Sequence, residues 1–334
     1  MYNIIQKRKI WFTISGILVI TSLILFFTWG LKLGIDFTGG SLLEVKYPGA
    51  VPTSAEVRNS LSDLNINSLS IQPAGDNGLI LRFQEIEEET HQQIIDRLNG
   101  LIPQAEGEIE PETGITIEGD TEASIKIEGN ALEGLEINTT SAQEVEELRF
   151  EAVGPSVGKE LRQNTYYAIF IVLIAIILYV AWAFRRVSKP IASWKYGLIA
   201  IIALFHDVII VVGVFTVFGK VLGVEVNTTF VAALLTVLGY SVNDTIVVFD
   251  RIRENLPKSD LDFEGTVNNS VNQSITRSIN TALTTILALL AIVFFGGETI
   301  KYFALALVSG IFFGTYSSIF LASPLLAWLE KIKK

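Results

Sequence analysis

Residues 226–249, VNTTFVAALLTVLGYSVNDTIVVF, form an apolar run long enough to cross a bilayer, and they contain one carboxylate, Asp244. A membrane-spanning helix needs about 20 predominantly apolar residues. An ionised carboxylate in the hydrocarbon costs at least about 2.5 kcal/mol, so such a residue normally faces a partner or a water-filled path. This stretch therefore predicts a helical membrane bundle with an ion or proton site.

Five further stretches of the chain are long and apolar enough, or nearly so, to cross a membrane. Half of the residues are hydrophobic and 18% are charged, and the mean hydropathy is +0.46, as in polytopic membrane proteins with a sizeable soluble part. The fifth run is short, so we expect its helix to begin earlier, within the polar residues 266–280, and we expect Pro324 to kink the sixth. The six predicted spans are residues 10–29, 165–184, 196–218, 226–249, 281–295 and 302–328.

Lysine and arginine are concentrated in every second connection between the spans. By the positive-inside rule, this asymmetry places both termini in the cytoplasm. Residues 30–164 then form one extracytoplasmic domain, between a first span in residues 1–29 and five further spans in residues 165–334. The basic residues on the predicted cytoplasmic side are Lys7, Arg8, Lys9, Arg185, Arg186, Lys189, Lys195, Arg251, Arg253, Lys258, Arg277, Lys331, Lys333 and Lys334.

The long connection, residues 30–164, has the sequence pattern of a small α+β domain. Its hydrophobic periods follow the order β-α-β-β-α-β, which is typical of a ferredoxin-like fold. Thr53 and Glu56 have the spacing of a helix capping box. The predicted elements are strands at 41–47, 69–72, 79–83 and 149–153, and helices at 53–64 and 87–101.

An acidic insert, residues 106–146, interrupts that order before the last strand. It repeats short phrases such as ITIEGD at 115–120 and IKIEGN at 125–130. Short hairpin strands, a small stacked β element and a partly mobile acidic loop are all consistent with this pattern. Residues 30–164 contain 9 Lys and Arg against 25 Asp and Glu, a balance that disfavours nucleic acid and anionic lipid as partners of this domain.

Several classes of chemistry are excluded by composition. The chain contains no cysteine, which rules out disulfides, thiolate metal sites and cysteine catalysis. The sequence of residues 30–164 shows no nucleophile–base arrangement and no metal-ligand cluster, and we interpret their only histidine, His91, as a packing residue. We therefore expect no enzymatic activity, no metal site and no bound cofactor.

Five motifs follow one another along the chain: GIDFTGG at 34–40, VGPSVG at 153–158, FHDV at 205–208, GYSVNDTIVVFDRIREN at 239–255 and SITRSINTALTT at 274–285. In this order, and at these positions relative to the spans, they resemble the motifs of the SecF family of protein-export membrane proteins. The resemblance covers essentially the whole chain apart from the acidic insert, which is longer than the family leads us to expect.

The resemblance implies an accessory subunit of the Sec protein-export machinery, within the resistance-nodulation-division superfamily, whose members couple proton flow to motions of extracytoplasmic domains. It implies SecD, the SecYEG channel, the unfolded preprotein and membrane lipid as partners, with YidC and YajC as further candidates and without nucleic acid. The coupling ion would be the proton. The location would be a bacterial plasma (inner) membrane or an internal energy-transducing membrane.

Two other functions are alternatives. A small-molecule exporter of the same superfamily normally carries two six-span halves in one chain, so 334 residues count against it. A passive scaffold would only stabilise SecD.

Asp244 and Arg277 form the first candidate for proton transfer. Asp244 lies six residues before Asp250, about 9 Å inside the cytoplasmic end of its span, and Arg277 lies near the cytoplasmic start of the next span. An adjacent cation favours an ionised carboxylate and burial favours a neutral one, so movement of Arg277 would switch proton binding at Asp244. A static ion pair that fastens two helices is the alternative.

Asp207 and His206 in the third span form a second candidate, about 18 Å from Lys195. Asp207 is either the next step of a proton path or a structural carboxylate bonded to serine or threonine hydroxyls of a neighbouring span. We interpret His206 as a packed or hydrogen-bonded residue rather than a relay. We expect Asn243 and Ser241 to form hydrogen bonds between helices.

Gly34, Gly39 and Gly40 follow the first span. They suit the exit of the chain from the membrane into the first strand, and a hinge at these glycines is the alternative. On the fourth span, Ala232, Ala233 and Gly239 would permit close packing against a partner helix.

Overall fold

The computed structural model describes residues 2–64, 66–75, 77–102, 144–183 and 192–331. The chain separates into two compact units. We call the first, which comprises Met1–Gly39 and Pro155–Lys334, the membrane unit, and the second, Gly40–Gly154, the sheet unit.

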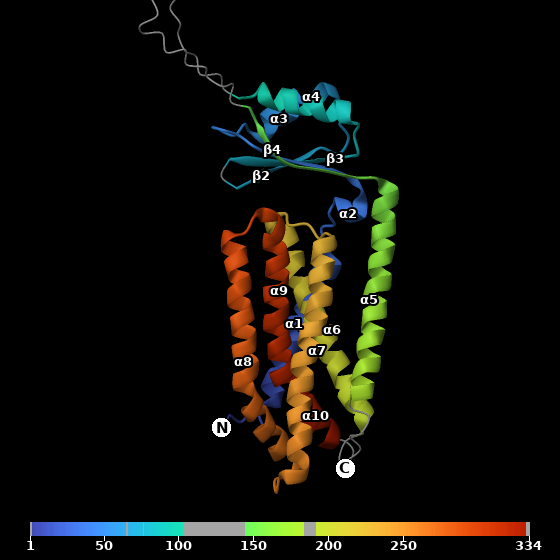
Figure 1. The fold of residues 1–334 in the computed structure, drawn as a ribbon, viewed down its shortest axis with the longest axis vertical. Helices are drawn as coiled ribbons and strands as arrows, with labels where there is room; N and C mark the ends of the chain where they lie inside the picture. The colour runs from blue at the N-terminus through green and yellow to red at the C-terminus, as the bar shows by residue number, and fades with distance from the viewer. Residues whose placement is uncertain (1, 65, 76, 103–143, 184–191, 332–334) are drawn as a thin grey trace, which may run out of the picture. The chain divides into compact units, whose positions relative to one another are not determined.

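Within its described residues, the membrane unit has six helices that are long and apolar enough to cross a bilayer. They confirm the six predicted spans and define a polytopic α-helical membrane protein (Figure 1). The helices are α1 (Arg8–Trp29), α5 (Pro155–Ala183), α6 (Ser193–Leu222), α7 (Thr228–Asn255), α8 (Phe263–Phe295), and α9 (Glu298–Ser317) continued by η3 (Ser318–Ala322) and α10 (Ser323–Lys331).

α8 begins before its apolar run, in the polar residues where the sequence predicts its start. The Asp262 side chain accepts a hydrogen bond from the Gly265 N–H at 2.9 Å, which is the usual way to satisfy a first-turn amide. Glu264 in the first turn adds a negative charge at the positive end of the helix. A short helical turn, η2 (Leu256–Lys258), precedes this cap.

The helices of the membrane unit divide into central and peripheral ones. About half of the residues in the most apolar part of α6, α7 and the last helix are buried, against few in α1, α5 and α8. Phe27 on α1, Phe170 on α5 and Phe295 on α8 are mostly exposed, as expected of side chains that face lipid instead of water. Figure 1 shows α5 and α8 on opposite sides of the bundle.

The last helix is interrupted once. η3 is a π-helical segment between α9 and α10, and the Ser323 hydroxyl donates to the Ser318 carbonyl at 2.9 Å. Pro324, the second residue of α10, lacks the N–H that would continue the α-helical hydrogen bonds. The irregular segment therefore lies where the sequence predicts a kink, since π turns and prolines are common sites of helix distortion.

The sheet unit has the predicted element order. Its four strands form one antiparallel sheet in the order β2-β3-β1-β4. The predicted capping box is present, because the Thr53 hydroxyl accepts from the Glu56 N–H and the Glu56 carboxylate accepts from the Thr53 N–H. The elements are β1 (Gly40–Lys46), α3 (Ser54–Ser60), η1 (Ser62–Leu64), β2 (Ser70–Ala74), β3 (Gly78–Phe83), α4 (Glu88–Asn99) and β4 (Glu146–Val153).

The described interior of the sheet unit is mainly hydrocarbon. Leu43 and Val45 of β1, Leu81 of β3 and Leu98 of α4 are fully buried in one cluster. These positions on β1 are the ones that alternation along residues 41–47 predicts for the inner face.

A β-bulge lies on β4 where it faces α4. The pairing of β4 with β1 shifts by one residue at Leu148. Residues three apart on a regular strand point to opposite faces. Because Leu148 is an extra residue in the pairing, Glu147 and Phe150 instead lie on the same face. Both pair with buried residues of β1. The buried His91 ring of α4 stacks on Phe150 with the centroids 3.9 Å apart, which agrees with its interpretation as a packing residue.

Some predictions fall outside the described residues. The acidic insert is described only at residues 144–146, so both repeated phrases lie outside. The same holds for the basic residues Arg185, Arg186, Lys189, Lys333 and Lys334.

Candidate functional site

Asp207 lies on α6 and is completely buried. Its Oδ2 atom accepts hydrogen bonds from the hydroxyls of Ser241 on α7, at 2.5 Å, and Ser317 on α9, at 2.8 Å. Its Oδ1 atom lies 2.8 Å from Nδ1 of the neighbouring His206. One carboxylate thus connects three helices, which is the arrangement expected of a structural carboxylate. A role in a proton path stays a prediction.

Asp244 lies on α7 and is also buried. Its Oδ1 atom accepts a hydrogen bond from the Ser278 hydroxyl on α8 at 2.7 Å. Its Oδ2 atom is shielded from solvent but has no hydrogen-bond partner in the part of the chain that the structure describes. One oxygen therefore fixes the position of the carboxyl group while the other is open to accept a proton or a hydrogen bond.

Hydroxyl groups from the central helices and from α8 surround the two carboxylates. The Thr245 and Ser318 hydroxyls, on α7 and η3, are 2.8 Å apart. Gly314 of α9 permits the close approach of Ser241, since a Cβ atom at position 314 would lie 3.0 Å from the Ser241 Cβ. We call the following residues the polar cluster: Asp207, Ser241, Asp244, Thr245, Ser278, Ser317 and Ser318.

Arg277 lies at the predicted depth but does not pair directly with Asp244. The next residue of α8, Ser278, donates to Asp244, and successive residues of an α-helix point about 100° apart. Arg277 is accordingly turned to the exposed side of α8. The static ion pair, which was the alternative for these two residues, is not formed in the described structure.

The remaining polar candidates separate into buried and exposed residues. Ser241 forms the predicted hydrogen bond between helices. Asn243 instead lies on the exposed side of α7, and no hydrogen bond from it to another helix is found among the described residues. His206 is buried, and its ring lies nearly parallel to that of Tyr316 with the centroids 6.1 Å apart. These are the contacts of a packed residue, as we interpreted His206.

The three glycine candidates differ in conformation. Gly39 and Gly40 have φ angles of 75° and 125°, values that favour glycine. Gly34 is extended, with φ −77°, but a Cβ atom there would lie 3.3 Å from the Val226 carbonyl oxygen. The lack of a side chain at Gly34 thus lets the chain pass close to Val226. At Gly39 and Gly40 it permits the positive φ angles. The hinge stays a prediction.

Asp36, in the short helix α2 (Ile35–Thr38), was not singled out by the sequence analysis. Its Oδ2 atom accepts hydrogen bonds from the Thr228 N–H at 2.8 Å and the Thr228 hydroxyl at 2.6 Å. Thr228 begins α7, so this carboxylate caps the helix that carries Asp244 and lies at its positive end. Arg162 of α5 donates to the Phe37 carbonyl at 2.5 Å. The glycine-rich motif therefore links α5 to the start of α7.

The hydroxyl partners of the carboxylates were also missed. Ser278 lies within a quoted motif but received no role. Ser317 and Ser318 are adjacent polar residues inside a mostly apolar predicted span. That adjacency is the signal that could have identified them, because polar groups inside a membrane need internal partners.

The described residues contain no set of three or more His, Cys, Asp or Glu side chains that could hold a metal ion. What the polar cluster offers chemically is hydrogen bonding and proton exchange between carboxyl and hydroxyl groups.

Comparisons with known proteins identify the family. A family model described as "Protein export membrane protein SecD/SecF, C-terminal" matches residues 135–332, and one described as "SecD/SecF GG Motif" matches residues 24–47. The protein translocase subunit SecF of Thermobaculum terrenum is 41% identical over 99% of this chain and 95% of its own length. The chain belongs to the SecF family. The first model covers the polar cluster, and the second covers the motif that contains Asp36.

Further SecF relatives and a solved structure extend this result. The protein translocase subunit SecF of Anaerolinea thermophila is 39% identical over 98% of this chain and 94% of its own length. The crystal structure of SecDF from Thermus thermophilus, a translocon-associated membrane protein, is 29% identical with a TM-score of 0.75. It covers 98% of this chain, but this chain spans only 38% of the SecDF chain.

Proposed function

We propose that this chain is an accessory subunit of the Sec protein translocase and that, with SecD, it uses the proton-motive force to promote protein export. The translocase role is supported by similarity over nearly the whole length to proteins named protein translocase subunit SecF. Proton coupling is supported by one observation above all. Asp244 is held through Oδ1 by Ser278, while its buried Oδ2 has no partner among the described residues.

The arrangement of α7 and α8 provides a switch for the proton. Ser278 faces Asp244, and Arg277 is the residue before it on α8. A rotation of α8 about its own axis by up to about 100° would exchange a neutral hydroxyl for a guanidinium at the carboxylate. Because a neighbouring cation favours the ionised form of a carboxyl group, the rotation releases the proton and its reversal allows uptake.

An exposed stripe on α7 suits a partner helix. Ala232, Thr236, Gly239 and Asn243 are exposed and follow one another at intervals of three or four residues. A Cβ atom at Gly239 would meet nothing within 4 Å. Small residues permit close helix packing in membranes, so we place SecD against this stripe, where Asn243 gains its interhelical hydrogen bond. We propose SecYEG, the preprotein, YidC and YajC as further partners of the complex with SecD.

We also propose on which side of the membrane each part of the chain lies. The sheet unit is a ferredoxin-like extracytoplasmic domain, supported by its element order and by the strand order β2-β3-β1-β4. Both termini are cytoplasmic, and the membrane is the bacterial inner membrane, as the distribution of basic residues favours.

The test is an Asp244→Asn variant, assembled with SecD and SecYEG in membrane vesicles. Asparagine preserves the shape and hydrogen bonding of the side chain but does not bind and release a proton near neutral pH. We expect normal insertion and assembly, together with loss of the stimulation of preprotein translocation by a proton gradient. The measurement is gradient-stimulated translocation, normalised to the amount of assembled complex.

The matched control is Asp250→Asn, the same substitution near the end of the same helix, where the carboxylate pairs with Arg253. It should keep full stimulation. Wild-type stimulation in Asp244→Asn would refute the proton site. A passive scaffold predicts instead that export falls only as assembled complex falls. A fastening pair predicts that Asp244→Arg combined with Arg277→Asp restores export.

A further inference from the structure

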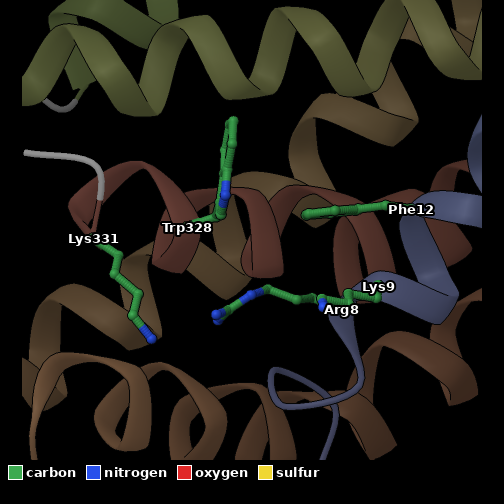
Figure 2. Close-up of a pocket in the computed structure, with 5 residues that line it drawn as sticks. All are labelled: Arg8, Lys9, Phe12, Trp328 and Lys331. Carbon is green, nitrogen blue, oxygen red and sulfur yellow. The ribbon is translucent and has the colours of Figure 1, made fainter.

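The start of α1 and the end of α10 enclose a pocket of about 260 Å³, separate from the polar cluster. Its volume lies slightly below the usual range for small-molecule pockets, about 300–1,000 Å³. We propose that this pocket binds the phosphate headgroup of an anionic membrane phospholipid. Figure 2 shows the lining residues, three cations and two aromatic rings: Arg8, Lys9, Phe12, Trp328 and Lys331.

The cations of the pocket outnumber the carboxylates beside it. Arg8 Nη1 lies 2.9 Å from Glu264 Oε1 of α8, and Lys331 Nζ lies 3.9 Å from Oε2 of the same carboxylate. Figure 2 shows the Arg8 and Lys331 side chains extending towards one another. Lys9 is exposed and has no ion-pair partner among the described residues. Glu264 therefore neutralises part of the charge of the described lining residues, and the remaining positive charge attracts an anion.

The backbone at the start of α1 adds to this preference. Its first turn contains no acidic residue, and the preceding Lys7 makes no side-chain hydrogen bond to the helix. The positive end of the helix dipole favours an anion there. The Arg8 and Ile10 N–H groups already donate to the Ile5 and Lys7 carbonyls, so the preference comes from the dipole and the neighbouring cations.

The place of the pocket favours a lipid over a soluble anion. Arg8 is the first residue of α1 and Lys331 is the last of α10, and both helices belong to candidate spans. Trp328 is partly exposed beside them, as tryptophans at membrane–water interfaces are. A lipid whose headgroup occupied the pocket would lay its acyl chains along α1, whose Ile10 and Ile17 are exposed. Basic pockets between helices at the cytoplasmic surface are known to bind anionic headgroups.

The test uses the full chain in a neutral detergent, titrated with phosphatidylglycerol or phosphatidylcholine. Bound lipid is counted by native mass spectrometry. We expect one phosphatidylglycerol to bind in preference to phosphatidylcholine. Each basic residue near an anionic headgroup contributes about fivefold to affinity, so Lys9→Gln with Lys331→Gln should weaken phosphatidylglycerol binding about tenfold or more.

The matched control is Arg251→Gln with Lys258→Gln, which removes two positive charges from exposed positions outside the pocket. It should change the affinity less than about twofold. If the double variant folds poorly, Lys331→Gln alone tests the proposal, because this side chain is exposed. It should lower the logarithm of the phosphatidylglycerol affinity by about half as much as the double variant.

Three results would overturn the proposal. Equal losses in the pocket and control variants would mean that general surface charge attracts the lipid. Equal binding of both lipids would mean that the pocket does not recognise charge. Displacement of phosphatidylglycerol by an equal concentration of inorganic phosphate would make a soluble anion the ligand.

Discussion

In the sheet unit the fully buried side chains are mostly hydrocarbon, such as Leu43 and Leu81, whereas the central helices of the membrane unit bury Asp207 and Asp244 among serine hydroxyls. The outer surfaces differ in the opposite sense, because the sheet unit exposes charged side chains such as Glu56 and Glu88. The peripheral helices of the membrane unit expose large apolar side chains such as Phe295.

Both patterns follow from the same physical rule. Apolar groups avoid water, and polar groups need either water or a hydrogen-bonding partner. In water, the rule gathers hydrocarbon inside. In a bilayer, hydrocarbon gains little from leaving lipid, so close packing and polar contacts hold helices together. The sheet unit should therefore depend on buried apolar volume, and the membrane unit on the fit between helices.

The largest expected effect tests the apolar core of the sheet unit. Leu81→Ala removes a fully buried side chain and should lower the free energy of unfolding of this unit by about 2–5 kcal/mol. Hydrogen exchange of the β1 and β3 amides in the full chain measures it. Leu148→Ala, at a half-exposed position, should cost less than about 0.5 kcal/mol. Equal loss of protection in the two variants would contradict the comparison.

A smaller effect tests helix packing in the membrane unit. A Cβ atom at Gly310 of α9 would overlap the Val237 side chain of α7, so Gly310→Ala should destabilise the bundle by about 1–3 kcal/mol. Thermal unfolding of the detergent-solubilised chain measures it. Gly16→Ala on α1, where a Cβ atom meets nothing within 4 Å, is the control. A control that unfolds at the same lowered temperature would show that close packing at Gly310 is not the cause.

The smallest effect concerns a surface charge of the sheet unit. Hydrogen bonds from Thr53 hold the pKa of the Glu56 carboxyl below its ordinary value of 4.5. A lowered pKa in the folded state means that this contribution to stability is complete above about pH 4.5 and is lost as pH falls through the lower folded value. Protection of the α3 amides, corrected for intrinsic exchange, should decline over that range. Glu56→Gln should remove this dependence, and an unchanged decline would assign it to other groups.

Much of the architecture was predictable because it depends on local sequence. The six spans follow from runs of apolar residues, and the capping box follows from the spacing of Thr53 and Glu56. The early start of α8 was predictable from polar residues that continue the helix. These features require no knowledge of distant parts of the chain.

The contacts of the candidate site were less predictable, because residues far apart in sequence determine them. Asp36 caps α7 from 192 positions away, and Ser317 reaches Asp207 across 110. Asp244 was predictable from the sequence, because a carboxylate within a membrane span is energetically costly whichever way its side chain points. Whether Arg277 or Ser278 faces it depends on the rotation of α8, which hydrophobic periodicity does not determine for a helix with a polar first half.

The π-helical segment η3 sets the phase of the C-terminal helix. A residue of an α-helix advances by about 100° around the axis, so deletion of one residue within Ser318–Ala322 would rotate α10 by about that angle as a unit. Leu326 and Ala327 are buried and Trp328 is partly exposed, and all three would exchange surroundings. In an alignment of relatives, a one-residue gap at this place would mark a changed lipid-facing surface, although the hydropathy of the helix would be almost the same.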